Sequence, residues 1–243
     1  MKIALIGYGK MGKTIENIAT QRGHDVILRL DINDAKEFAK LHNADVAIEF
    51  TRPESAYDNL KRCIDANVPV VCGTTGWLAR YDDLMRYCHE RKGTFFYASN
   101  YSIGVNIFFE INRHLAVMMN GYPMYDVKME EIHHTQKLDA PSGTAITLVE
   151  DILKNFNRKT NWVCNTPDES GQVEGGENDI AITAKRIDPA PGTHIITYDS
   201  PIDSIEITHI AHSREGFATG AVLAAEWIVG KKGVYSMKDM LGF

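Results

Sequence analysis

The sequence K-I-A-L-I-G-Y-G-K-M-G, residues 2 to 12, decides the fold. Its apolar run Lys2–Ile6 predicts a short strand, and a helical pattern follows the glycines as far as about Arg22. The spacing G-x-G-x-x-G between a strand and a helix is typical of dinucleotide binding. The first glycine permits a tight turn, the second lets the backbone approach a pyrophosphate, and the third lets the helix pack on the strand. The pyrophosphate would lie at the helix N-terminus, where unpaired N–H groups favour negative charge.

A second strand and an acidic residue follow in the order that such a site requires. Gly23-His24-Asp25 turns the chain into Val26–Leu30, which ends at Asp31. A carboxylate at that point can accept hydrogen bonds from an adenosine ribose. The alternative is a glycine turn without a nucleotide, in which Asp31 merely caps a loop. The complete order of strand, turn, helix, strand and acid favours the nucleotide.

Strands and helices continue to alternate through the first part of the chain. We expect strands at Asp45–Phe50, Val68–Cys72 and Thr94–Ala98, and helices at Glu54–Ala66 and from about Leu78 to Arg91. This alternation indicates an α/β fold with a Rossmann-type, doubly wound parallel sheet. Ligands of such sheets bind beyond the carboxyl ends of the strands, where three loops are rich in hydroxyls, amides and glycine: residues 50–53, 73–77 and 98–102. Turn chemistry alone could explain any one of these loops.

The pattern changes after a long predicted helix at Ile103–Asn120. A strand-like run at Met124–Ile132 and an amphipathic helix at Ala145–Phe156 precede three further strand-like runs at Ile180–Ile187, Thr193–Tyr198 and Ser204–Ala211. Strands that do not alternate with helices predict a second, α+β domain with a mixed sheet.

We therefore expect a dinucleotide-binding domain at residues 1–103 and a substrate-binding and oligomerisation domain at 104–214. The last helix, Phe217–Val229, lies within residues 215–243, which should return to the first domain. The polar, glycine-rich stretch at 168–178 predicts a mobile loop.

Composition excludes several classes of protein. With 243 residues and 44% hydrophobic content, the chain can bury a proper core. Lys and Arg total 26 against 32 for Asp and Glu, and the net charge of -6 gives no general attraction to nucleic acid or to anionic membranes. No apolar run approaches the roughly 18 residues of a membrane span, and the glycine turn comes too early for a signal peptide. We expect a soluble, cytoplasmic protein, with cysteines that are free thiols rather than metal or redox groups.

The stretch Glu131–Ala145, E-I-H-H-T-Q-K-L-D-A-P-S-G-T-A, concentrates proton-handling and anion-binding groups. Its two histidines lie near the end of a predicted strand, so their side chains should point to different sides. Pro-Ser-Gly-Thr then predicts a helix entry with Ser142 as N-cap. Imidazoles, an ammonium group and free amides together favour a carboxylate receptor beside a proton donor. A solvated charged loop is the alternative. We expect no metal, because adjacent histidines lack the usual ligand spacing.

The motif H-H-x-x-K-x-D-A-P-S-G-T-A, residues 133–145, resembles the signature of the bacterial 4-hydroxy-tetrahydrodipicolinate reductases (dihydrodipicolinate reductases) of diaminopimelate and lysine biosynthesis. The similarity extends to G-Y-G-K-M-G at residue 7, G-T-T-G-W at 73, A-S-N-Y-S-I-G-V-N at 98 and H-I-A-H-S-R-E-G-F-A-T-G-A at 209. It implies NAD(P)H-dependent reduction of 4-hydroxy-tetrahydrodipicolinate, a cyclic dicarboxylate, to tetrahydrodipicolinate with loss of water. It also implies a homotetramer assembled through the sheet of the second domain.

The resemblance assigns roles to individual residues. It implies that His133 is the proton donor or acceptor and Lys137 a further proton donor. The substrate carboxylate contacts that it implies are His134, Ser142, Gly143 and Thr144. The cofactor-binding residues that it implies are Gly7, Tyr8, Gly9, Lys10, Met11, Gly12, Asp31, Gly73, Thr74, Thr75, Ala98, Ser99, Asn100 and Tyr101.

The sequence also departs from the family pattern. Thr135 stands where relatives often carry a basic residue, and the chain is short for the family, with the contraction expected between Asp31 and Asp45. Asp31 would repel a 2′-phosphate, whereas Lys10 or Arg29 could accommodate one, so we expect use of both NADH and NADPH with a lean toward NADH. Two alternatives are another NAD(P)H-linked reductase or amino-acid dehydrogenase of the same plan, and a dinucleotide sensor without turnover.

Overall fold

The structure is a computed structural model that describes residues 1–31, 37–164, 175–213 and 215–243. Most of the loop expected at 168–178 lies outside these residues, as does part of the expected contraction after Asp31. The chain divides into two compact units, one made of Met1–Asn106 with Glu215–Phe243 and the other of Ile107–Arg214. The division falls inside the long helix that begins at Ile103, a few residues after the boundary that the sequence suggests.

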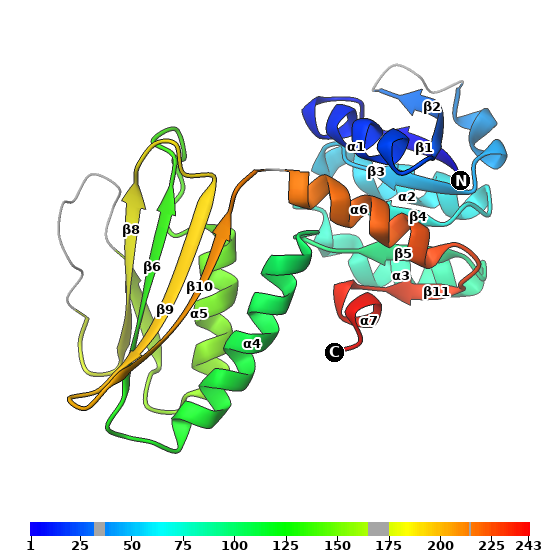
Figure 1. Cartoon of the computed structure of the whole chain (residues 1–243). Helices are drawn as coiled ribbons and strands as arrows, with labels where there is room; N and C mark the ends of the chain where they lie inside the picture. Colours follow the sequence, from blue (N-terminus) through cyan, green and yellow to red (C-terminus); the bar gives the residue numbers. More distant parts are fainter. Residues whose placement is uncertain (32–36, 165–174, 214) are drawn as a thin grey trace. The chain divides into compact units, whose positions relative to one another are not determined.

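The first unit contains a six-stranded sheet in the order β11-β5-β4-β3-β1-β2 (Figure 1). Its strands are β1 (Lys2–Ile6), β2 (Asp25–Leu30), β3 (Val46–Glu49), β4 (Val70–Cys72), β5 (Thr94–Tyr97) and β11 (Gly233–Tyr235). Every pairing is parallel, so the predicted Rossmann-type doubly wound sheet is confirmed. The edge strand β11 was not predicted, because three residues give no periodicity to detect.

Helices cover both faces of this sheet, which is why its central strands are mostly apolar. One face packs against α1 (Lys10–Gln21) and α6 (Glu215–Ile228), and the other against α2 (Pro53–Asp65) and α3 (Tyr81–Glu90). Three short helices complete the unit: η1 (Glu37–Asn43), η2 (Leu78–Arg80) and α7 (Met237–Leu241). The small residues of α6 allow close packing, since a Cβ at Gly220 would lie 1.7 Å from the Tyr101 carbonyl oxygen.

The second unit contains a five-stranded sheet in the order β10-β9-β6-β8-β7. Its strands are β6 (Asp126–His133), β7 (Asn161–Cys164), β8 (Asp179–Arg186), β9 (Gly192–Asp199) and β10 (Ser204–Ala211). β8 is parallel to β6 and β7, whereas β9 is antiparallel to β6 and β10, so the sheet is mixed as predicted. The helices α4 (Ile103–Asn120) and α5 (Gly143–Asn155) supply apolar side chains to the core on one face of the sheet.

The register of this sheet brings four polar side chains together at the end of β6. Glu131 and His133 alternate with partly buried residues and share the helix-covered face. The parallel pairing places Arg186 of β8 opposite His133, and the antiparallel pairing places His194 of β9 opposite Glu131. These four residues lie on the same face of the sheet as the apolar core, next to its apolar side chains. The helix α5 begins beside them.

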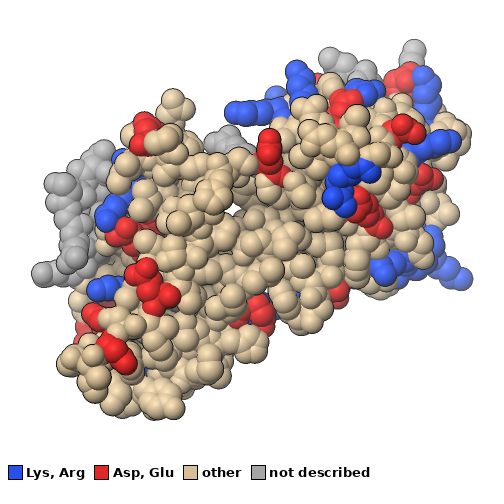
Figure 2. Space-filling view, in the orientation of Figure 1, with Lys and Arg blue, Asp and Glu red and all other residues tan. Residues whose placement is uncertain are grey.

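Helix hydropathy and surface charge bear on how the chain can bind an anionic ligand. Among the helices that the structure describes, none combines the length and the hydropathy needed to cross a bilayer. Lys and Arg side chains are interspersed with Asp and Glu on the face seen in Figure 2. Because the net charge of the chain is -6, an anionic ligand must be attracted by local groups rather than by the net charge.

Candidate active site

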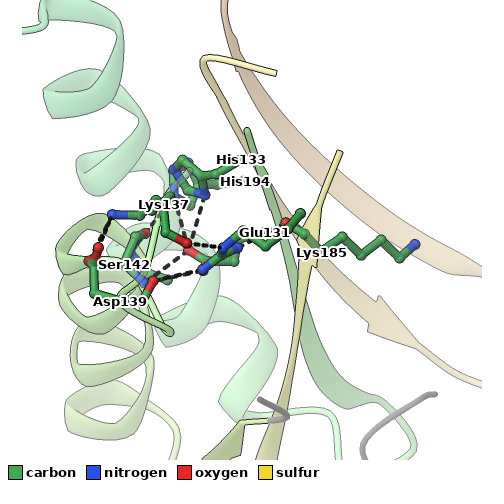
Figure 3. A network of polar contacts seen from close by, with 9 residues as sticks. Glu131, His133, Lys137, Asp139, Ser142, Lys185 and His194 are labelled. Carbon is green, nitrogen blue, oxygen red and sulfur yellow. Dashed lines mark hydrogen bonds and ion pairs between the residues drawn. The ribbon is translucent and has the colours of Figure 1, made fainter. Parts of the chain in front are cut away.

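A buried carboxylate, Glu131 on β6, is the centre of the site in the second unit. Its side chain is 1% exposed, and both of its oxygens accept from the backbone N–H of Ser142, at 3.1 and 3.2 Å. One oxygen also accepts from Nη2 of Arg186 at 3.1 Å. A buried carboxylate is stable only with such donors, so Glu131 fixes the sheet to the start of α5 (Figure 3).

Two imidazoles lie beside this carboxylate. The rings of His133 and His194 are 5.2 Å apart and nearly perpendicular, at 74°. Nδ1 of His133 and Nε2 of His194 each lie 3.7 Å from the same oxygen of Glu131. His194 Nε2 is also within hydrogen-bonding distance of the Ser142 hydroxyl, at 3.1 Å. The cluster thus joins β6, β9 and the entry to α5.

Burial determines the charge state of these imidazoles. Burial lowers the pKa of His133, and the positive charges of Lys137 and Arg186 act in the same direction, while Glu131 opposes them. Burial, followed by the charge of His133, lowers the pKa of His194 to about 3. His194 is therefore neutral at neutral pH, and its approach to Glu131 is not an ion pair.

Lys137 is paired with a carboxylate that the sequence analysis did not anticipate. Its ammonium group contacts both oxygens of Asp139, at 2.8 and 2.7 Å, and its side chain is 20% exposed. The hydrogen bond from Lys137 is the main cause of a lowered pKa at Asp139. The Asp139 side chain is 65% exposed, so an incoming carboxylate can exchange with it.

The helix entry has the predicted geometry. Ser142 is the N-cap of α5, and its hydroxyl accepts from the N–H of Ala145 at 3.2 Å. A Cβ at Gly143 would meet nothing within 4 Å, so the backbone at the first residue of the helix borders open space. Thr144 follows in the first turn. Free amides at a helix N-terminus suit an anion.

The two adjacent histidines and the threonine that follows them differ in burial and in hydrogen bonding. His133 is the last residue of β6 and is buried, whereas His134 is only partly buried, as alternation along a strand predicts. The N–H and hydroxyl of Thr135 donate to the two oxygens of Asp188, at 3.1 and 2.6 Å. These two donors are therefore not available to bind an anion.

Three members of the cluster were missed in the sequence: Glu131, Arg186 and His194. Each comes from a different strand, so only the register of the sheet reveals that they meet. A signal was nevertheless present at Arg186. The strand pattern of β8 buries Ile180, Ile182 and Ala184, and a charged residue at the next position in that phase indicates a buried polar partner.

The cluster also has the composition of a metal site. Donor atoms of Glu131, His133 and His194 all lie within 4.8 Å of one another. However, the carboxylate already accepts from Arg186 and from a backbone amide, and a guanidinium group 3.1 Å away opposes the binding of a cation. The donor set therefore fits a hydrogen-bonded anchor better than a metal centre.

In the first unit, the glycine-rich turn has the geometry that its spacing predicts. Gly7 has a φ of +95°, and a Cβ there would lie 1.9 Å from the Phe50 carbonyl oxygen. A Cβ at Gly12 would lie 2.2 Å from the Gly7 oxygen, so this glycine allows α1 to pack on the turn. Gly9 has open space, and no side chain caps the start of α1. The turn can therefore receive a phosphate on the backbone N–H groups.

The other loops at this edge of the sheet are held by their own hydrogen bonds. Thr74 is buried, and its hydroxyl accepts from the N–H of Thr51 at 2.7 Å. A Cβ at Gly73 would collide with the Phe50 ring at 2.1 Å. Tyr101 is in the core and donates to the Cys72 carbonyl at 2.7 Å, so only its backbone could contact a cofactor.

The remaining predicted cofactor residues differ in exposure. Ala98 is buried, Tyr8, Met11 and Asn100 are partly buried, and the exposed ones are Lys10, Asp31, Thr75 and Ser99.

Asp31 borders a cavity of about 290 Å³ at the ends of β1 and β2. Glu54, Asp58 and Arg62 of α2 are part of the same lining. Arg29, which the sequence analysis considered as a partner for a 2′-phosphate, instead donates to Glu16 on α1, at 3.0 and 3.1 Å. The hydroxyl of Tyr8 also donates to Glu16. The guanidinium group of Arg29 is thus already neutralised.

Residues 1–101 match the family model described as dihydrodipicolinate reductase, N-terminus, and residues 104–241 match its C-terminus. A relative from Christiangramia forsetii, named 4-hydroxy-tetrahydrodipicolinate reductase, is 48% identical over 241 residues, which cover 99% of this chain and 98% of the relative. A reductase of the same name from Neisseria meningitidis is 37% identical over 202 residues, covering 83% of this chain and 74% of the relative.

Two solved structures share the fold. A dipicolinate-bound dihydrodipicolinate reductase from Paenisporosarcina sp. TG-14 superposes with a TM-score of 0.78 at 21% identity and covers 99% of each chain. An amine dehydrogenase from Mycobacterium smegmatis gives a TM-score of 0.60 at 11% identity, covering 96% of this chain and 94% of its own. On the two family models and the relatives together, the chain belongs to the dihydrodipicolinate reductase family of pyridine-nucleotide-dependent oxidoreductases.

Proposed function

We propose that this chain catalyses the NAD(P)H-dependent reduction of 4-hydroxy-tetrahydrodipicolinate to tetrahydrodipicolinate, with release of water, in the diaminopimelate route to lysine. One observation carries the proposal. In a chain 48% identical to a reductase of that name, His133 and the Ser142 N-cap of α5 lie against one buried carboxylate, Glu131, and Lys137 lies in the segment between them. Such a cluster offers a proton donor and an anion receptor side by side.

The proposed role of the first unit is to hold the dinucleotide. The pyrophosphate binds at Gly9 and the first amides of α1, where a side chain would otherwise fill the space. Asp31 accepts hydrogen bonds from the adenosine ribose, and the 73–75 and 98–101 loops take the nicotinamide half. When bound, the nicotinamide supplies the hydride.

The proposed role of the second unit is to bind the substrate carboxylates. The amides of Gly143 and Thr144 at the N-terminus of α5 receive one carboxylate, with Ser142 and His134 alongside. The open space at Gly143 supports this assignment, because no part of the chain fills it. Lys137 exchanges its contact with the exposed Asp139 for a contact with the substrate. A dianion is then held by local charge on an acidic protein.

His133 is the proposed proton donor. Its pKa is lowered in the free protein, chiefly by burial, so the imidazole is largely neutral before substrate binds. A dianion beside it favours the charged form, and the imidazolium and Lys137 then stabilise the electron density that develops on the ring as hydride arrives. Proton transfer from His133 completes the reduction.

We also propose use of both NADH and NADPH, with a lean toward NADH. Among the described residues that line the cavity, Asp31, Glu54 and Asp58 place carboxylates where a 2′-phosphate would lie, and Arg62 places one guanidinium group there. The bond from Arg29 to Glu16 removes a second cation from that role. Lys10, exposed at the first residue of α1, is a cation that would favour NADPH.

The open face of the second sheet supports the proposal of a homotetramer. This face, opposite the one that packs on α4 and α5, carries Ile132, Ile195 and Ile210, and Ile210 is 55% exposed. Apolar residues on one face of a sheet are typical of a surface that is covered by another subunit. Light scattering coupled to gel filtration gives the mass directly, and a monomer at micromolar concentration would contradict this assembly.

The function is tested by following NADH oxidation with freshly generated 4-hydroxy-tetrahydrodipicolinate. The proposal predicts rapid, substrate-dependent oxidation and no turnover of small 2-oxo acids with ammonia. Turnover of the 2-oxo acids instead would identify an amino-acid dehydrogenase of the same plan. Cofactor binding without oxidation of either kind would identify a dinucleotide sensor.

A further inference from the structure

The guanidinium group of Arg186 connects four acceptors around the proposed substrate-binding segment. Its Nε donates to the Lys137 carbonyl at 3.1 Å, and its Nη2 donates to the Asp139 carbonyl at 2.7 Å. Nη1 donates to the Lys185 carbonyl at 2.8 Å, and Nη2 also reaches Glu131 at 3.1 Å. The side chain is only 6% exposed, so all three nitrogens are committed to the protein.

Glu131 completes the arrangement from the other end of the segment. Its side chain, 1% exposed, accepts from the backbone N–H of Ser142, which is the N-cap of α5. Arg186 therefore holds the backbone at residues 137 and 139, and Glu131 holds it at residue 142. The two side chains are bonded to each other, so the segment 137–142 is attached at both ends to one rigid pair on β6 and β8.

A gain in folding stability does not explain why Arg186 and Glu131 form a buried ion pair. Desolvating a carboxylate and a guanidinium group offsets most of their attraction, and apolar residues of similar volume often stabilise a fold as well or better. What apolar residues cannot supply is a planar fork that fixes two carbonyl groups and a carboxylate in one geometry. A lysine in its place keeps the charge and loses the fork. The arrangement thus indicates a function in orientation.

We propose that Arg186 is a positioning residue, which together with Glu131 holds the segment 137–142 in the conformation that presents Lys137 and the start of α5 to a substrate carboxylate. This inference rests on the proposed function of the site and adds two residues to it. Neither needs to touch the substrate. Their effect passes through the backbone that carries Lys137 and Ser142.

Amide hydrogen exchange tests the positioning without any ligand. Arg186→Lys and Arg186→Met are compared with the wild type, and Lys185→Met is the matched control. Lys185 is the preceding residue, is 44% exposed, bonds to Glu130 and points away from the cluster (Figure 3). We expect exchange in the 134–145 peptide to rise at least about tenfold in both Arg186 variants and to stay unchanged in the control.

Steady-state kinetics separate positioning from mere folding. We expect the KM for the dicarboxylate to rise and kcat/KM to fall about a hundredfold in Arg186→Met, with smaller changes in Arg186→Lys and with the KM for NADH unchanged. A purely structural role would lower the amount of folded enzyme and leave the substrate KM at its wild-type value. If Arg186→Met does not fold, Glu131→Gln provides the second variant and should give the same exchange and KM changes.

Two outcomes would overturn the inference: wild-type exchange in the 134–145 peptide of the Arg186 variants, or a substrate KM equal to that of Lys185→Met. Failure of the proposed function is a separate result, because a wild-type protein that does not oxidise NADH still reports on positioning through exchange. Binding of pyridine-2,6-dicarboxylate, measured by calorimetry, then replaces KM as the readout of carboxylate capture.

Discussion

His194 illustrates how strongly burial governs the chemistry of single residues in this site. It has the same imidazole as His133 and shares a carboxylate neighbour with it, yet its pKa is lowered to about 3, chiefly by burial. His133 lies at the end of its strand, nearer to the segment that carries Lys137, and Glu131 opposes the lowering of its pKa. One imidazole therefore suits a neutral hydrogen-bonding role, and the other can be charged by a substrate.

The lowered pKa of His194 predicts a pH-dependent stability. A histidine titrates near pH 6.5 in the unfolded chain and near 3 here, so the unfolded state binds one more proton in between. Stability is thus lost as the pH falls below 6.5, at about 1.4 kcal/mol per pH unit for this group. Urea unfolding of wild type and His194→Gln at pH 5 and 6 measures the slope. The variant should lack this contribution, and equal slopes would mean that His194 is charged in the native protein.

Lys137 and Asp139 predict opposite effects on substrate binding. Lys137→Ala removes a cation from the proposed pocket, so kcat should fall about a hundredfold and KM should rise together. Asp139→Asn removes the carboxylate that occupies the Lys137 ammonium in the free protein, so KM should fall. Kinetics of both variants with 4-hydroxy-tetrahydrodipicolinate test the pair. Unchanged constants in Lys137→Ala would remove this lysine from the mechanism.

At the scale of elements, one helix N-terminus in each unit has a glycine beside open space. Gly9 at the start of α1 and Gly143 at the start of α5 both border open space, whereas Gly12 packs against the Gly7 carbonyl. Where a Cβ would meet no atom of the chain, packing does not require glycine, and the absent side chain leaves room for a ligand. The two positions therefore allow cofactor binding and substrate binding to be disturbed separately.

We predict that Gly9→Ala raises the KM for NADH alone and that Gly143→Ala raises the KM for the dicarboxylate alone. Neither change should lower the melting temperature by more than a few degrees, because the new methyl group meets no protein atom. Gly12→Ala serves as the control and should destabilise the protein, since its Cβ would lie 2.2 Å from an oxygen. The same KM change in both of the first two variants would argue against separate sites.

The elements also show how much the sequence could reveal. The parallel sheet, the mixed sheet and the Ser142 cap follow from local patterns, because apolar periodicity, glycine spacing and capping chemistry act over neighbouring residues. Arg186 and His194 escaped notice because they join the site through strand register, which depends on contacts between distant segments. The pairing of Lys137 with Asp139 was missed for a different reason, since it depends on the conformation of a turn.

At the scale of the whole molecule, an acidic chain must bind two anionic ligands. The net charge of -6 cannot attract them, and charges of both signs are interspersed on the face in Figure 2. In the proposed function, helix N-termini and Lys137 supply the attraction locally, and His133 adds to it once it is protonated. We propose that the charges on the cavity beside Asp31 decide the preference between NADH and NADPH.

The carboxylates on that cavity predict the cofactor preference. Asp31, Glu54 and Asp58 repel a 2′-phosphate more than Arg62 attracts it, so kcat/KM should be higher for NADH than for NADPH. Asp31→Asn should narrow the difference by raising kcat/KM for NADPH. Paired assays at one ionic strength give both values. A strong preference for NADPH in the wild type would contradict the charge argument.

The central claim is that the cluster at the end of β6 performs the proton chemistry of a reductase whose cofactor binds to the other unit. Comparison of wild type and His133→Gln tests it most directly, with kcat measured for 4-hydroxy-tetrahydrodipicolinate and NADH affinity measured by fluorescence titration. The account predicts a fall in kcat of about a hundredfold or more, with NADH affinity unchanged. A wild-type kcat in the variant, or a loss of NADH affinity instead, would contradict it.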